Sequence, residues 1–425
     1  MEGLKNELFK FLDESTTAYH AVANIAAALD AAGYVRLYED DAWALEDKKG
    51  YYVIRDGSSV IAFRNGGGSF MIGAAHSDSP AFRVKSVSGN SRYVRLSTEK
   101  YGGLINYTWL DRPLAISGRV TVKENGGIRI RLVSLPGTVL IPSLAIHLNR
   151  GVNDGAKLSL TSDMIPLASL AASGAPTLEA LTAMALGLNE EDIISHELYL
   201  TAADKAAAVG LAGELVLSPR LDDLSAVWAS LSAFLTAPVA EGTTPVLAVF
   251  DNEEVGSETK QGAASTFLYD TLVRISGGED EYRRRIASSF MVSADNAHAI
   301  HPNHPELSDA ENAPVLGGGV VIKYNANQRY TTDAVSDAIL RTLAQRAGVR
   351  VQTYFNRADM PGGSTLGSIA DTKVPVATVD IGIPQLAMHS ANESCAIADV
   401  FEARSLMAQL FGSRLCRHGD DITLV

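Results

Sequence analysis

The sequence predicts an α/β fold: a mainly parallel sheet with helices on both faces, interrupted by an inserted β-rich domain. Short apolar runs typical of buried strands recur along the chain, together with stretches of helical periodicity, as in parallel sheets. From about residue 82 to residue 201, short alternating strands and tight turns indicate antiparallel pairing instead. We therefore expect one domain built from residues 1–82 and 206–425, with residues 83–205 inserted into it.

Composition narrows the class of protein. The chain has 425 residues, enough for two or three domains, with 46% hydrophobic and 20% charged residues, which is typical of a soluble globular protein. Its formal net charge of -13 argues against nucleic acid or an anionic membrane as the main partner. No apolar run approaches the roughly 18 residues of a membrane-spanning helix.

The cysteines and the N-terminus bear on the compartment. Cys395 and Cys416 cannot build a disulfide framework, and no Cys-x-x-Cys pair is present, so a reducing compartment fits best. The N-terminal residues are charged and lack the apolar core of a secretory signal. We expect a cytoplasmic protein.

The N-terminal region predicts two helices and three strands. Residues 4–32 show helical periodicity, with Ser15 or Thr16 capping the second helix and Gly33 ending it in the left-handed region. Strands are expected at residues 51–54, 60–63 and 70–75. The third strand runs into His76-Ser-Asp78, which suits a metal-binding histidine whose second ring N–H is accepted by the aspartate. A histidine that is merely hydrogen-bonded is the alternative.

The most informative stretch follows an apolar run at residues 245–250. It reads Asp251-Asn-Glu253-Glu254, three carboxylates directly after a buried strand. Buried carboxylates are costly unless they are paired or bind metal, and ligands of open parallel sheets gather beyond the carboxyl ends of the strands. Glu253 and Glu254 could divide the work, one holding a cation and the other moving a proton. A solvated acidic turn is the alternative.

Three further acidic or histidine positions occupy comparable places. Asp222 and Asp223 open an apolar helix, where acids are normally dipole caps. Asp295 ends a strand at residues 289–293. His389 lies beyond a strand at residues 374–380, and two more strands, at 320–324 and 349–354, flank a helix near 333–346. His298, His301 and His304 follow Asp295, but we expect them to be ordinary loop residues.

Residues 360–367 form a glycine-rich loop in which the backbone near Gly363 and Ser364 can approach a ligand closely. The loop lacks the Gly-Lys-[Ser/Thr] ending of a P-loop, so phosphate binding is not predicted there.

Together these residues predict a two-metal centre. Two histidines with several carboxylates suit zinc or another borderline divalent ion, but they are too many for one tetrahedral site. They suit two ions bridged by one carboxylate, which clamp a carbonyl and lower the pKa of a water towards roughly 7. The remaining glutamate is then free to act as a general base. The residues concerned are His76, Asp222, Glu253, Glu254, Asp295 and His389.

Motifs spread over nearly the whole chain resemble the aspartyl aminopeptidase family of dinuclear zinc exopeptidases, which includes yeast vacuolar aminopeptidase. They occur in the family's order: His76-Ser-Asp-Ser-Pro, Tyr101-Gly-Gly, Ile141-Pro-Ser-Leu-Ala-Ile-His147, Arg220-Leu-Asp222, Asp251-Asn-Glu-Glu-Val-Gly-Ser257, the Ser293–Asn303 segment around Asp295, the Val321–Tyr330 segment around Lys323, and Pro384-Gln-Leu-Ala-Met-His389-Ser390.

The resemblance assigns a role to each metal ligand. His76 and Asp295 would hold one ion, Glu254 and His389 the other, and Asp222 would bridge them. The cofactor would be two Zn²⁺ per subunit, for which Co²⁺ or Mn²⁺ could substitute.

The resemblance also assigns roles around the metals. Glu253 would take the proton from the bridging water and pass it to the leaving amine, and Asp78 would orient His76. The peptide bond between Asp222 and Asp223 would be cis. Lys323 would face the acidic side chain of the substrate's first residue, although a solvated lysine at a strand end is the alternative.

Three positions depart from the family pattern. Many members carry a histidine that one subunit contributes to its neighbour's site; the aligned residue here is Tyr107. The arginine expected after His389 is missing from Ala391-Asn-Glu393, and Asp223 replaces a common asparagine. These changes affect the expected preference for acidic residues and the cross-subunit contact, but they leave the metal ligands in place.

The resemblance implies a metallo-aminopeptidase that removes the N-terminal residue of peptides, with a preference for Asp or Glu. Its β-rich insert would serve subunit contact in a tetrahedral dodecamer built from dimers. A deacylase of N-acyl amino acids from the same clan is one alternative. Another is a non-enzymatic scaffold for assembly or cargo with a structural metal site, but such a site has no need of the free base Glu253.

Overall fold

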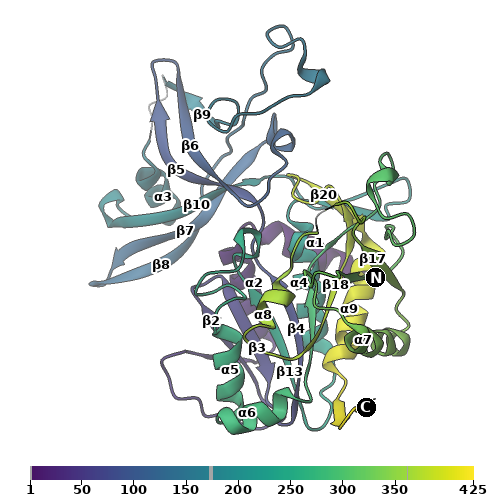
Figure 1. Cartoon of the computed structure of the whole chain (residues 1–425). Coiled ribbons are helices and arrows are strands. Elements are labelled where there is room, and N and C mark those ends of the chain that lie inside the picture. Colours follow the sequence, from purple (N-terminus) through teal and green to yellow (C-terminus); the bar gives the residue numbers. More distant parts are fainter. Residues whose placement is uncertain (1, 172–175, 361) are drawn as a thin grey trace.

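The computed structural model describes residues 2–171, 176–360 and 362–425. It contains a large α/β body and a smaller β-rich body that stands beyond one end of it (Figure 1). The α/β body holds both ends of the described chain, and the β-rich body is formed by the middle of the sequence.

A nine-stranded sheet forms the centre of the α/β body. Its inner strands β13, β4, β14 and β18 are mutually parallel, and every residue of β13, β4 and β14 is buried. Such strands need cover on both faces of the sheet. The strands, in spatial order, are β1 (Val35–Leu37), β2 (Gly50–Arg55), β3 (Ser59–Arg64), β13 (Thr243–Phe250), β4 (Ser69–His76), β14 (Phe290–Ala294), β18 (Ala377–Gly382), β16 (Val320–Tyr324) and β17 (Val351–Phe355).

Helices cover the two faces of this sheet, as predicted. One face packs against α1 (Glu2–Glu14), α2 (Ala18–Ala31), α4 (Leu221–Thr236), α7 (Ala334–Ala347) and α9 (Ile397–Phe411), whose apolar residues form one core with the sheet. The other face packs against α5 (Phe267–Ser276), α6 (Glu279–Ile286) and α8 (Leu366–Ala370). The fold class predicted from the sequence is confirmed.

The β-rich body is a six-stranded antiparallel sheet with its own apolar core. It begins at β5, only a few residues after β4 ends, so it joins the α/β body next to the ends of the parallel strands. Its elements are β8 (Gly127–Ser134), β7 (Leu114–Glu124), β10 (Ile193–Ala202), β5 (Ala81–Gly89), β6 (Tyr93–Tyr101) and β9 (Leu167–Leu170) in spatial order, with α3 (Leu178–Leu186) and the short helices η1 (Asn106–Trp109), η2 (Val152–Asp154) and η4 (Glu190–Asp192).

Smaller elements complete the chain. A five-stranded sheet runs beside the ends of the large sheet, and a two-stranded hairpin closes the C-terminus. They are β11 (Ala207–Val209), β12 (Leu215–Ser218), β20 (Glu393–Ala396), β19 (Pro384–Leu386), β15 (Ala297–His298), β21 (Leu415–His418) and β22 (Asp421–Leu424), with the short helices η5 (Glu253–Val255) and η6 (Pro305–Leu307).

The two ends of α2 differ in how well the sequence predicted them. Gly33 has φ +82°, in the left-handed region, as predicted. The N-cap of α2 is Thr17, not Ser15 or Thr16: Thr17 has the extended backbone of a cap, while the buried Ser15 hydroxyl accepts from Asn24 Nδ2. None of the described helices is long and apolar enough to cross a membrane.

Candidate metal centre

The candidate residues meet where parallel strands end. β4 ends at His76, β13 is followed by Asp251-Asn-Glu253-Glu254, and β14 is followed by Asp295. Because β4 pairs in parallel with both β13 and β14, these ends lie at one edge of the sheet, where open α/β folds bind their ligands. Asp222 enters from the start of α4, and His389 from the segment between β19 and β20.

Asp222 lies between the two histidines. Its Oδ1 is 3.4 Å from Nε2 of His76, and its Oδ2 is 3.5 Å from Nε2 of His389. The carboxylate therefore turns one oxygen towards each histidine. The peptide bond that follows Asp222 is cis, as expected.

One further carboxylate accompanies each histidine. Asp295 Oδ1 lies 4.0 Å from His76 Nε2, and Glu254 Oε1 lies 3.3 Å from His389 Nε2. Three groups of possible ligand atoms result among the described residues, and within each all atoms lie within 4.8 Å of one another; one group joins His76 to Glu253 and Glu254. The other two groups both contain Asp222. Asp223 belongs to the one with His76 and Asp295, and its Oδ2 also accepts the main-chain N–H of His76 at 3.1 Å.

Unpaired oxygens show that these residues fit metal ions. Asp222 Oδ1 and Glu254 Oε1 are buried and have no hydrogen-bond partner among the described residues. A buried carboxylate oxygen without a partner is costly, and a cation would satisfy it. Imidazole nitrogens with carboxylate oxygens are a donor set that zinc accepts. The residues present therefore fit two divalent ions that share Asp222.

The pKa shifts of the cluster also indicate a metal site. Burial raises the pKa of Glu254 to about 7. Burial and the nearby Asp295 raise the pKa of Glu253 to about 9. Burial acts to lower the pKa of His389, but Asp222 and Glu254 outweigh it and raise that pKa to about 11. Protons thus neutralise the metal-free cluster, and metal binding would release them.

Asp78 connects the two halves of the cluster. The sequence led us to expect its carboxylate to orient His76; Nδ1 of His76 is in fact nearer the main-chain oxygen of Asp78, at 3.1 Å, than its Oδ1, at 3.4 Å. The carboxylate accepts the main-chain N–H groups of Glu253, at 3.1 Å, and Glu254, at 3.2 Å. Asp78 therefore positions the acidic segment after β13 as well as the histidine after β4.

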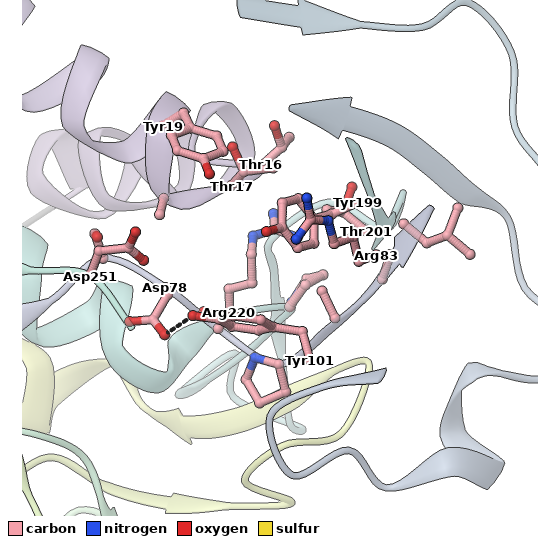
Figure 2. Close-up of a pocket in the computed structure, with 18 of the residues that line it drawn as sticks. Thr16, Thr17, Tyr19, Asp78, Arg83, Tyr101, Tyr199, Thr201, Arg220 and Asp251 are labelled. Carbon is pink, nitrogen blue, oxygen red and sulfur yellow. Dashed lines mark hydrogen bonds between the residues drawn. The ribbon is translucent and has the colours of Figure 1, made fainter. Parts of the chain in front are cut away.

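Tyr101 ties the β-rich body to this network. Its hydroxyl donates to Asp78 Oδ2 at 2.6 Å and accepts from Asn252 Nδ2 at 2.9 Å. Figure 2 shows the Tyr101–Asp78 contact in the wall of a cavity of about 230 Å³, lined also by Tyr19 of α2 and Tyr199 of β10. The cavity lies where the two bodies meet.

Sequence reasoning did not identify the role of Glu393. Its carboxylate accepts the main-chain N–H of Asp222 at 2.9 Å and that of His389 at 2.6 Å. One buried side chain thus holds the backbone of two candidate ligands that are far apart in the sequence. The only signal was its position four residues after His389.

A pocket of about 310 Å³ lies next to the cluster, and its lining includes Glu253, Gly363 and Ser364. Lys323 also lines it, is 3% exposed, and places Nζ 3.6 Å from Asp295 Oδ2. The alternative of a solvated lysine is therefore wrong. Pro361, in the same loop as Gly363, lies outside the described residues.

The remaining candidate residues differ in whether they line this pocket. His298, which we expected to be an ordinary loop residue, lines this pocket, whereas His301 and His304 do not; all three are exposed. Tyr107, on η1 of the β-rich body, is 68% exposed and does not line the pocket of its own chain.

Comparisons with known proteins agree with this geometry. The family described as aminopeptidase I zinc metalloprotease (M18) matches residues 11–411. A probable M18 family aminopeptidase 2 of Clostridium novyi is 40% identical over 96% of this chain and 98% of its own. One of the same description from Pseudomonas aeruginosa is 40% identical over 96% and 98%.

Solved structures share the fold. Ape4, in a complex with Nbr1, superposes with a TM-score of 0.92 at 34% identity, over 97% of this chain and 86% of its own. The mApe1 dodecamer of S. cerevisiae gives 0.82 at 27% identity, over 96% and 95%. An M18 aminopeptidase of Thermotoga maritima gives 0.82 at 26% identity, over 96% of each chain.

Replacing Glu393 by glutamine tests its role in holding the ligands. A glutamine amide carries only one acceptor oxygen, so it cannot take both main-chain N–H groups, and the backbones of Asp222 and His389 lose their fixed separation. Changes to groups that support metal ligands typically cost about 10–100-fold in metal affinity, and we expect a loss of that size for zinc.

The affinity is measured by competition with a chromogenic chelator, and the absorption spectrum of the Co²⁺-loaded protein reports the ligand geometry. Glu311→Gln, in an exposed loop, is the matched control. Unchanged zinc affinity and an unchanged Co²⁺ spectrum in Glu393→Gln would show that Glu393 does not position the ligands.

Proposed function

The chain belongs to the M18 family of zinc aminopeptidases, and from this premise we propose that it removes single N-terminal residues from peptides with two zinc ions at the centre described above. Family membership makes the protein a metal-dependent peptidase, a hydrolase of peptide bonds. The observation that carries the two-ion proposal is the orientation of Asp222, whose oxygens face different histidines at 3.4 and 3.5 Å.

In this proposal His76 and Asp295 would hold one ion, Glu254 and His389 would hold the other, and Asp222 would be shared by both. When bound, the two ions would supply Lewis acidity that polarises the scissile carbonyl and makes an attacking water more acidic. The native metal would be zinc, with Co²⁺ or Mn²⁺ as substitutes.

Glu253 is the proposed general base. It lines the pocket beside the metal ligands, and the N–H groups of its own peptide and of the next are held by Asp78. Its carboxylate takes a proton from the attacking water and then delivers it to the nitrogen of the leaving amine. Burial raises the pKa of Glu253, which favours a carboxyl that can keep the proton between the two transfers.

We propose that Lys323 binds the acidic side chain of the substrate's first residue. Burial acts to lower its pKa, but Asp295 and Tyr330 outweigh it and raise that pKa above its usual range, so the amine stays charged inside the pocket. A buried ammonium in the pocket wall would favour a substrate carboxylate. The backbone around Gly363 and Ser364 would contact the substrate on the same side.

We further propose that residues 1–82 and 206–425 form the catalytic domain and residues 83–205 an oligomerisation domain. The S. cerevisiae neighbour is a dodecamer, and the edge strand β8 of the insert exposes Ile128 and Ile130, 67% and 59% accessible. A tetrahedral dodecamer built from dimers would bury such residues and bring Tyr107 to a neighbouring subunit's pocket.

Active sites enclosed in such an oligomer would admit only short or unfolded peptides. A cytoplasmic location fits the charge and the cysteine content of the chain.

Replacing Glu253 by glutamine removes the proposed base but keeps the side chain's shape. We expect kcat for aminoacyl anilides to fall by roughly 10²–10⁴-fold, because proton transfer by a positioned carboxylate contributes about that much. Bound zinc should be unchanged. The measurement is steady-state kinetics together with metal analysis of the same preparation.

Glu258→Gln, an exposed glutamate five residues further on, is the matched control and should keep full activity. Near-normal turnover in Glu253→Gln would remove the assigned role. Loss of zinc along with activity would show instead that Glu253 is needed for metal binding.

Replacing Lys323 by alanine tests the acidic preference. We expect kcat/KM for Asp- and Glu-anilides to fall by about 10–100-fold, as for the loss of a hydrogen bond to a charged group, mostly through KM, while Leu-anilide is little affected. Lys260→Ala, an exposed lysine, is the control. An equal loss for all three substrates would mean that Lys323 supports Asp295 and does not select substrates.

A further inference from the structure

A basic hollow lies at the end of the α/β body away from the β-rich body, where α6 approaches the C-terminal hairpin of β21 and β22 (Figure 1). Its volume is about 350 Å³, and it is open to solvent. Ser69, the first residue of β4, lines it, whereas His76 is the last residue of that strand. At about 3.3 Å per residue, the seven steps from Ser69 to His76 separate the hollow from the metal centre by roughly 23 Å.

The charge of this hollow is opposite to that of the whole protein. The chain carries a formal net charge of -13. Four arginines and a histidine nevertheless line the hollow, and Glu281 is the single acid among its described lining residues; Arg284 is paired with Glu281 and with the neighbouring Asp280, so the other three arginines carry the free charge. The basic residues are Arg284, Arg285, Arg414, Arg417 and His418.

Arg285 supplies positive charge from inside the wall. It is 7% exposed, and its guanidinium donates to the main-chain oxygens of Gly68 and Ile275 and to the Thr244 hydroxyl. No carboxylate that the structure describes lies within 4.0 Å of it. Since a buried cation without a counter-ion is costly, its charge favours an anion nearby.

Arg414 and Arg417 supply free donors at the surface. Within the part of the chain that the structure describes, the side chain of Arg414 makes a single long contact, 3.4 Å from Nη1 to the Glu241 main-chain oxygen. Arg417 makes no side-chain hydrogen bond or ion pair with any residue in the described ranges. Both are exposed, and neither has a described carboxylate within 4.0 Å. Most of their N–H groups are therefore available to a ligand.

We propose that this hollow binds a small oxyanion with at least two negative charges, of the sulfate or phosphate type, held by the guanidinium groups of Arg414 and Arg417 beside the buried charge of Arg285. The planar N–H fork of arginine matches two oxygens of such an anion. The Ser288 hydroxyl, in the same wall, supplies a further donor. The bound anion joins α6 to the β21–β22 hairpin and so fixes the C-terminal end of the chain on the α/β body.

Equilibrium dialysis of the zinc-loaded protein with radiolabelled sulfate tests this proposal, because sulfate is a weak ligand for zinc. Ionic strength is held constant with sodium chloride. We expect one saturable sulfate per subunit in the natural protein. Removing two charge-assisted contacts in the double variant Arg414→Gln/Arg417→Gln should weaken binding by about tenfold or more. Crystals grown with selenate should show an anomalous peak between the two arginines.

Arg36→Gln, an exposed arginine on β1, is the matched control and should bind sulfate as the natural protein does. All three proteins should keep the same peptidase activity without sulfate, which shows that each is folded. Equal sulfate affinity in the double variant would overturn the proposal, as would the absence of saturable binding. Sulfate binding only after the subunits are dissociated would also overturn it, because an acidic group of a second copy would then be the occupant.

Discussion

The buried carboxylate of Asp222, shared between two histidines, is the interaction on which the rest of the site depends. Its oxygens point in two directions, to His76 at 3.4 Å and to His389 at 3.5 Å, and Oδ1 has no hydrogen-bond donor among the described residues. Several carboxylates buried this close together repel one another and lose hydration. Two divalent ions would offset both costs. The acidic cluster is thus unfavourable for the metal-free fold and favourable once metal is present.

The fold holds these buried carboxylates together by fixing the backbone around them as well as their side chains. Parallel strands deliver His76, the Glu253–Glu254 pair and Asp295 to one edge of the sheet. Two further carboxylates then hold main-chain N–H groups: Asp78 those of the glutamate pair, and Glu393 those of Asp222 and His389. Tyr101 adds a contact from the β-rich body, so the site depends on both bodies of the chain.

The sequence predicted the parts of the site that follow strand ends. A buried apolar run followed by an acid or a histidine is a local pattern, and the meeting of such ends follows from parallel pairing. The contacts of Glu393 and Asp78 with main-chain N–H groups were not predictable, because they depend on the path of two distant backbones. Burial of Lys323 likewise depends on β17 and β18 pairing on either side of β16. Arg284 and Arg414 come together only because the C-terminal hairpin returns to α6.

The most direct test of the account is zinc-edge anomalous diffraction from crystals grown with zinc. Dinuclear hydrolase centres hold their ions about 3.5–4 Å apart, and we expect two peaks at that separation on opposite sides of the Asp222 carboxylate. One peak should lie beside His76 and Asp295, and the other beside Glu254 and His389. A single peak, or two peaks that do not share Asp222, would contradict the account.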